Sequence, residues 1–177
     1  MNATLFGIPV EVSHRFVGPS ATMRVKLVGL LPLVNAGGPI MGKAETVTLF
    51  NDWCVVASGA LISPNITWRE IDAHTVNATF TNLAHTVCAV LTFNAAGELI
   101  DFVADGRGAV SADGKSFVEM RWSTPLCDYR AFGAHRMASH GDGVWDAAAG
   151  KFSYLEFDID DLEFNVSTTA LGTKPAK

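Results

Sequence analysis

The sequence is poor in cysteine, in charged residues and in long apolar runs, and each shortage excludes a class of protein. Its three cysteines, Cys54, Cys88 and Cys127, are an odd number without metal-ligand spacing, which favours free thiols in a reducing compartment. Charged residues make up 18% of the chain and sum to −5, so no basic face is present for nucleic acid. No apolar run approaches the roughly 20 residues that a membrane-spanning helix requires.

The N-terminus and the histidines exclude further possibilities. The first residues, MNATLFGIPVEV, lack the basic and apolar regions of a signal peptide, although a mature chain whose signal had been removed would look the same. Together with the free thiols, this favours a cytoplasmic location. The five histidines form no i,i+4 pair on a helix and no His-x-His pair, so we expect no metal site, and we predict no cofactor.

What is present is enough apolar material for one domain. The chain has 177 residues, of which 49% are hydrophobic, a length and composition that suit a single domain with a substantial core. We predict one β-rich domain over residues 1–166, followed by a flexible tail at residues 167–177.

Residues 43–57, KAETVTLFNDWCVVA, are the one segment with the period of an amphipathic helix. Val47, Phe50 and Cys54 recur at spacings of three and four and form an apolar stripe, whereas Glu45 and Asp52 fall on the opposite side. A helix of this length is not stable alone, so we expect its stripe to pack on a sheet.

The rest of the chain has the alternation and the turn residues of antiparallel strands. Residues 10–17 and 22–29 predict a hairpin, and residues 32–42 predict a loop into the helix. After the helix, alternating segments predict eight strands, at residues 66–71, 75–81, 85–93, 99–110, 116–123, 127–132, 136–145 and 152–165. The predicted fold is mostly β: a single curved antiparallel sheet, a half-barrel of lipocalin-like or lipoprotein-carrier-like shape, with one amphipathic helix on its concave face.

Two predicted turns set the register of the central strands. A two-residue turn at 113–114 places Asp105 opposite Trp122 and Arg107 opposite Met120, and a four-residue turn at 94–97 places Thr86 opposite Asp105. One face is then almost purely apolar, and the other is mixed, carrying Thr86, Cys88, Asp105, Arg107, Trp122 and Thr124. This mixed face has the composition of a pocket wall, but a slip of one residue would exchange the two faces.

Several short motifs occur in an order that resembles an uncharacterised bacterial family, known only as a domain of unknown function. They are E-T-V-x-x-F-N-D at residues 45–52, D-x-R at residues 105–107 and W-S-T-P at residues 122–125, followed by Tyr129 and Arg136. The resemblance runs from the first hairpin to Asn165. It supports the fold and implies no activity. Gly106 departs from the family pattern, in which an acidic residue often stands there, and Ala147-Ala148 replaces a turn with proline.

The candidate catalytic residues are Asp52, Asp105 and Arg107. Asp105 and Arg107 lie two apart on one strand and are expected to point the same way, either as a surface ion pair or as an arginine fixed by an aspartate to bind a ligand. For Glu45, the alternative to a role in the site is a structural one, because the helix dipole stabilises a carboxylate in the first turn of a helix. The candidate ligand-binding residues share positions on the helix or the neighbouring strands: Glu45, Trp53, Thr86, Arg107, Met120, Trp122, Tyr129 and Arg136.

Three functions are compatible with these residues. The first is binding of a small apolar or amphipathic molecule between the helix and the sheet, with Arg107 and Trp122 as orienting contacts. The second is a cofactor-free lyase, isomerase or hydrolase, with a carboxylate base and Arg107 as anion stabiliser. The third is a structural domain whose mixed face makes a homo-oligomer. The first two require Asp105, Arg107 and Trp122 to share one interior space.

Overall fold

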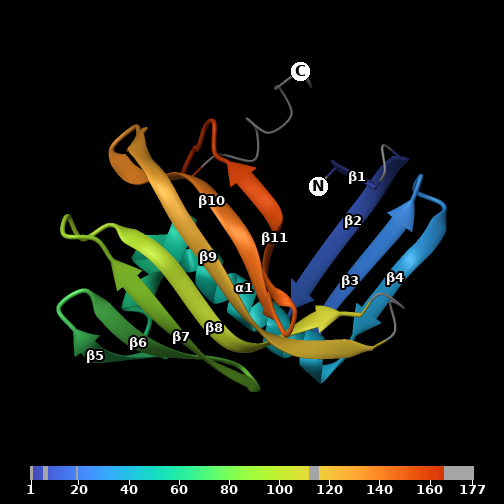
Figure 1. The fold of residues 1–177 in the computed structure, drawn as a ribbon, viewed down its shortest axis with the longest axis horizontal. Helices are drawn as coiled ribbons and strands as arrows, with labels where there is room; N and C mark the ends of the chain where they lie inside the picture. Colours follow the sequence, from blue (N-terminus) through green and yellow to red (C-terminus); the bar gives the residue numbers. More distant parts are fainter. Residues whose placement is uncertain (1, 6–7, 19, 112–115, 166–177) are drawn as a thin grey trace.

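The protein consists of two antiparallel β-sheets joined by one long α-helix (Figure 1). The computed structural model describes residues 2–5, 8–18, 20–111 and 116–165. The smaller sheet has the order β1-β2-β3-β4, with the strands β1 (Asn2–Leu5), β2 (Ile8–Val17), β3 (Ser20–Leu27) and β4 (Leu31–Gly37).

The larger sheet has seven strands in the order β11-β10-β9-β8-β7-β6-β5, so each strand lies beside its neighbour in sequence. Its strands are β5 (Ile66–Asp72), β6 (Thr75–Asn82), β7 (His85–Phe93), β8 (Leu99–Val110), β9 (Phe117–Phe132), β10 (His135–Ala147) and β11 (Gly150–Asp158). The helix α1 (Pro39–Val56) and a short 3-10 helix, η1 (Ser58–Ile62), connect the two sheets. Within the described ranges, the helices fall short of the length and apolar character that a membrane crossing demands.

The mostly β, antiparallel fold with one α-helix is confirmed, but the strands form two sheets instead of one. The chain leaves the smaller sheet at Gly38, whose φ of +90° turns it away, and Pro39 follows at the start of α1. The helix then separates the two groups of strands. The predicted turn at 113–114 and the predicted tail at 167–177 lie outside the described residues.

Two prolines are accommodated where the sequence predicted breaks. Residues 31–37 form β4, although a loop was predicted there, because β4 is an edge strand and Pro32 sits beside a register shift. Pro125 lies inside β9, which runs unbroken where two strands were predicted. It pairs with Asp101 of β8, and the pairing of β9 with β10 lapses between Leu126 and Ser123. The missing backbone donor of Pro125 therefore leaves the ladder to β8 intact.

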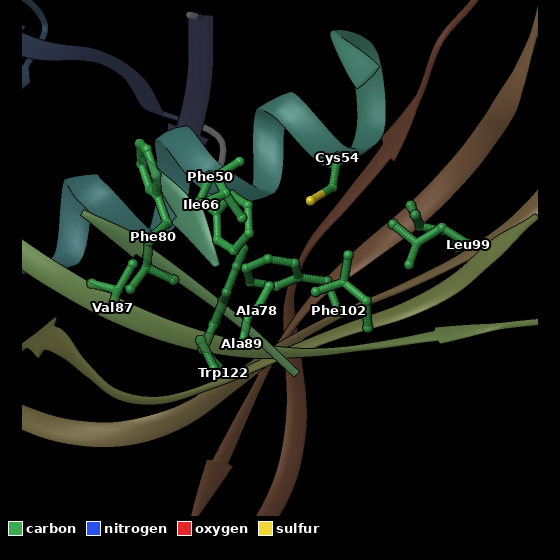
Figure 2. Packing of buried hydrophobic residues seen from close by; sticks show 14 of the residues in the cluster. Phe50, Cys54, Ile66, Ala78, Phe80, Val87, Ala89, Leu99, Phe102 and Trp122 are labelled. Carbon is green, nitrogen blue, oxygen red and sulfur yellow. The ribbon is translucent and has the colours of Figure 1, made fainter. Parts of the chain in front are cut away.

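The core lies between α1 and the concave face of the larger sheet (Figure 2). Phe50 is fully buried, and its ring centroid lies 5.1 Å from that of Phe80 and 5.6 Å from that of Phe102. The other side of α1 contacts β3 and β4 of the smaller sheet, where Met41 packs with Ala21 and Ala36. The first half of α1 is therefore covered on two sides, which holds the second half in place over β8–β11.

Candidate functional site

A cavity of about 250 Å³ opens between the second half of α1 and strands β8 to β11. We call it the arginine pocket. Its apolar walls come from α1 and from the end of the chain: Val55, Val56, Leu155, Phe157 and Ile159. Its polar residues are Thr48, Asn51, Asp52, Arg107, Thr124 and Asp142, and the remaining lining is Trp122, Gly143 and Tyr154. The pocket is thus mostly apolar with a few polar groups, which is the usual composition of a small-molecule site.

A β-bulge in β8 brings Arg107 into this pocket. Ala104 pairs with Trp122 and Arg107 with Met120, so two residues of β8, Asp105 and Gly106, oppose the single residue between them on β9. Gly106 has φ +67°, a backbone conformation that glycine adopts without strain. Because of the extra residue, Arg107 faces the helix together with Ala104 and Trp122.

Arg107 is a buried cation held by neutral groups. Its residue is 9% exposed, and its Nη2 donates a hydrogen bond of 2.9 Å to the Oγ1 of Thr48. The guanidinium carbon lies 4.5 Å from the ring centroid of Trp122 and 5.0 Å from that of Trp145. Among the residues that the structure describes, no carboxylate oxygen lies within 4.0 Å of this guanidinium. The positive charge is therefore stabilised by aromatic faces and one hydroxyl, without an ion pair.

Four buried polar atoms of residues that line the pocket have no hydrogen-bond partner within the described part of the chain. They are Asn51 Nδ2, Arg107 Nε, Trp122 Nε1 and Thr124 Oγ1. Buried polar atoms in native proteins are nearly always paired, and an unpaired one costs about 1–3 kcal/mol. All four belong to residues that line the same cavity. An ordered water or a bound molecule is needed to pair them.

Asp52 lies at the mouth of the pocket, where it keeps contact with solvent. Burial on its protein side raises the pKa of this carboxyl to about 6, and the nearby Glu45 carboxyl raises it further, while Arg107 lowers it. The carboxyl group of Asp52 therefore changes its charge within one pH unit of neutrality, in the same cavity as Arg107.

The family of the chain follows from a comparison with family models. The model of a family of unknown function, DUF6544, matches residues 1–157. The chain belongs to DUF6544. No curated protein and no solved structure matches it. The predicted resemblance to an uncharacterised domain family thus agrees with the family that is found, and the matched range covers every residue of the arginine pocket except Ile159.

In this member of DUF6544, Asp105 does not join Arg107, contrary to the prediction. Asp105 is exposed and accepts hydrogen bonds of 2.7 and 3.2 Å from Nε and Nη2 of Arg121. The cause is the bulge. Residues two apart on a regular strand face the same side, but the extra residue of the bulge places Asp105 and Arg107 on opposite sides of the sheet. The predicted shared interior space therefore holds Arg107 and Trp122 without Asp105.

Thr86 is also outside the arginine pocket. Ala89 pairs with Ala104, which shifts β7 by two residues from the predicted register and keeps the predicted faces of β7. Thr86 is exposed and lies with Cys88 and Asp105 along a groove on the face of the sheet opposite Ala104. The mixed face predicted from the sequence is thus divided between the two sides of the sheet.

Two other predicted residues, Tyr129 and Arg136, line a second cavity of about 300 Å³ on the other side of Val55, which we call the tyrosine pocket. Tyr129 Oη donates a 2.7 Å hydrogen bond to the carbonyl of Leu99, and Arg136 Nε donates one of 2.7 Å to Glu98 Oε1. The polar side chains of this pocket are therefore satisfied by the protein itself.

Glu45, Trp53 and Met120 are near the site without lining the arginine pocket. Glu45 is buried and acts on the pocket through its charge, which raises the pKa of Asp52. The Trp53 ring packs on Phe80 with centroids 4.9 Å apart, and Met120 packs against the core. These three residues support the pocket from outside.

Three residues at the site were not predicted from the sequence: Asn51, Thr48 and Trp145. Thr48, Asn51 and Val55 recur at helical spacing, which was a usable signal for a second stripe on α1. Trp145 pairs with Trp122 across β9 and β10, and this register follows from a two-residue turn at 133–134. Extending the register argument to β10 would have found Trp145.

Proposed function

We propose that the arginine pocket binds a small, largely apolar molecule. The observation that carries this proposal is the cavity itself: it has apolar walls from α1 and β11, and four of its lining residues carry buried polar atoms that the described protein leaves unpaired. A pocket filled by the protein's own packing would satisfy such atoms or exclude them. A ligand with one polar end and an apolar body fits both parts.

The volume sets the size of the ligand. A cavity of 150 Å³ holds benzene, so one of about 250 Å³ suits roughly ten non-hydrogen atoms. This size corresponds to a medium-chain or single-ring compound, and it is too small for a nucleotide or a long-chain lipid.

We propose a cytoplasmic setting for the protein. The three free thiols, Cys54, Cys88 and Cys127, support this proposal. A net charge of −5 argues against nucleic acid as the partner. A homo-oligomer is the other partner to test, by light scattering of the purified protein.

A cofactor-free enzyme is the alternative, and one observation favours it. Asp52 and Arg107 line the same cavity, and a carboxyl with a pKa of about 6 is a competent general base at neutral pH. Arg107 would then stabilise the developing anion. Asp105 has no part in this version, because it is paired with Arg121 outside the pocket. Asp52→Asn would abolish turnover of a bound compound while leaving its binding intact; turnover that survives this change excludes Asp52 as the base.

Binding is tested first without assuming an identity for the ligand. Native mass spectrometry of protein purified from its host would detect a retained small molecule, and a thermal-shift screen with medium-chain fatty acids and aromatic acids would find compounds that raise the melting temperature. We expect at least one class to stabilise the protein. A protein that carries no ligand and is stabilised by none of these compounds contradicts the proposal.

A further inference from the structure

The unpaired atoms of the arginine pocket are nearly all hydrogen-bond donors. Arg107 Nε, Trp122 Nε1 and Asn51 Nδ2 can only donate, and the hydroxyl of Thr124 can donate as well. Their residues are deeply buried, with exposed fractions of 9%, 4%, 6% and 2% respectively. A single group that accepts hydrogen bonds from more than one of them needs several lone pairs.

We infer that this donor cluster binds the carboxylate head of a small monocarboxylic acid, whose apolar body lies against Val55, Leu155 and Phe157. The inference rests on the proposed function and narrows its ligand to one chemical class. A carboxylate has two oxygens and about four lone-pair sites, and it accepts from a guanidinium in a planar, two-bonded geometry.

The charge of the site favours an anion over a neutral carbonyl. The Arg107 guanidinium is buried, and its contacts are the Thr48 hydroxyl and the rings of Trp122 and Trp145. The Asp52 carboxyl acts on this charge only from a distance, without an ion pair, and a bound carboxylate supplies a counter-charge in direct contact. An amide or ketone would use the donors and leave the charge without such a contact.

The same charges disfavour a dianion such as a phosphate. Arg107 is the one cationic side chain lining the pocket within the described residues, and the carboxyl groups of Asp52 and Asp142 line it too. A second negative charge on the ligand would have no cation to pair with and would add to the repulsion that these two carboxyls already exert on a single charge. The pocket therefore accommodates at most one negative charge, in contact with Arg107.

The test compares probes of equal size that differ in the head group. Octanoate and phenylacetate carry the carboxylate, octanamide and phenylacetamide carry a neutral carbonyl, and hexylphosphonate carries a dianion; each has about ten non-hydrogen atoms. Isothermal titration calorimetry on the full chain at pH 9, where the phosphonate is doubly ionised, gives the affinities. We expect the carboxylates to bind at least about tenfold more tightly than the amides and the phosphonate, as one charge-assisted contact predicts.

Arg107→Met removes the charge proposed to bind the carboxylate head and leaves the walls that contact the apolar body of the ligand. Arg136→Met in the tyrosine pocket makes the same chemical change and is the control. Arg107→Met should make acid and amide affinities equal, whereas Arg136→Met should keep the preference for the acid. Trp122→Phe provides a second variant that removes one donor and keeps an aromatic ring. In the unaltered protein, the indole proton of Trp122 should move downfield in an NMR titration with phenylacetate and stay in place with phenylacetamide.

The outcomes separate the two proposals. Amides or the phosphonate that bind as tightly as the acids, with no effect of Arg107→Met, overturn the carboxylate inference and leave the proposed function standing. If none of the probes binds, the carboxylate inference is overturned, and the proposed function is overturned as well when native mass spectrometry and the thermal-shift screen also find no ligand. Should Arg107→Met fail to fold, an unchanged acid preference in Trp122→Phe together with an unmoved indole proton overturns the inference.

Discussion

The arginine pocket and the tyrosine pocket lie on the two sides of Val55 and are similar in size, about 250 and 300 Å³, but they treat their polar groups in opposite ways. In the tyrosine pocket, Tyr129 donates to the backbone of Leu99 and Arg136 pairs with Glu98. In the arginine pocket, Asn51 Nδ2, Arg107 Nε, Trp122 Nε1 and Thr124 Oγ1 are buried and have no partner among the described residues. The polar groups of the tyrosine pocket are explained by pairing within the protein, whereas the unpaired atoms of the arginine pocket are the reason why we propose a ligand there.

The acidic residues of the two pockets differ in the direction in which the protein shifts their pKa values. Hydrogen bonds from Asn94 and Arg136 hold the pKa of Glu98 below its ordinary value, because they stabilise the charged carboxylate. Asp52 has a raised pKa, because the protein desolvates it without supplying a comparable partner. Cys54 in the tyrosine pocket has a pKa raised to about 12 by burial, so its thiol stays neutral there. Pairing within the protein thus accounts for the state of Glu98 in the tyrosine pocket, but it accounts only in part for the polar groups of the arginine pocket.

The largest expected effect comes from filling each pocket in turn. Leu155→Trp adds a large ring to the wall of the arginine pocket, and Leu61→Trp adds the same ring to the tyrosine pocket. We expect Leu155→Trp to weaken binding of the best compound from the thermal-shift screen by about 100-fold, since the indole occupies the space of the ligand, and Leu61→Trp to change it less than about threefold. Calorimetry measures both, and circular dichroism verifies the fold. The reverse pattern would move the binding site to the tyrosine pocket.

Much of the larger sheet was predictable because its turns are chemically explicit. The bounds of β7 and β8 agree with those predicted, and Arg107 pairs with Met120 as the turn at 113–114 requires. Between β8 and β9 the alternation rule then fails at one place, between Ala104 and Arg107. Counting residues along a strand assumes that the strand has no insertion, so a single bulge reverses every assignment beyond it. Gly106 inside a strand pattern was the available signal.

The site was predictable to the extent that its residues follow regular spacing. Arg107, Trp122 and Thr124 were placed on one face, and they do line one pocket. The smaller sheet covers the first half of α1. This contact could not be predicted, because no motif in the first hairpin indicates which element it packs against. The side of the sheet that the helix occupies depends on this long-range packing.

The next comparison uses pH. For Asp52 the pKa is about 6 in the folded protein and near 3.9 in an unfolded chain, so the folded state binds more protons between these values. Its contribution to the free energy of unfolding therefore falls as pH rises from about 4 to about 6. Asp52→Asn should remove this fall and raise the stability at pH 7 relative to the unaltered protein, measured by urea unfolding. Equal stability of the two proteins across this range would show that Asp52 is well solvated.

Glu98 provides the matched control with the opposite sign. Its folded pKa is lowered, so its contribution is present above the unfolded pKa and is lost as pH falls through the folded pKa. Glu98→Gln should therefore lower the stability at pH 7 and have a diminishing effect in acid. A carboxyl-detected NMR titration should give Asp52 a pKa near 6 and Glu98 one below its ordinary value. A reversed order of the two pKa values would contradict the distinction between the pockets.

The smallest expected effect concerns stability without ligand. Arg107→Met replaces a buried guanidinium that has no ion pair by an apolar side chain of similar length. We expect the desolvation penalty that it removes to exceed the hydrogen bond to Thr48 and the contacts with Trp122 and Trp145 that it loses. We expect the free energy of unfolding to rise by about 1 kcal/mol. Arg136→Met breaks an ion pair whose arginine side chain is 60% exposed, and it should change the stability by less than about 0.5 kcal/mol.

These two variants decide what the buried arginine is for. Urea unfolding of both in the absence of ligand, repeated with saturating octanoate, gives the comparison. If Arg107 serves a ligand, the unaltered protein is the less stable one when empty and gains the more from octanoate, because only it can pair the bound carboxylate. A loss of more than about 2 kcal/mol in empty Arg107→Met would make Arg107 a structural residue, held by its two tryptophans in the way that Arg136 is held by Glu98.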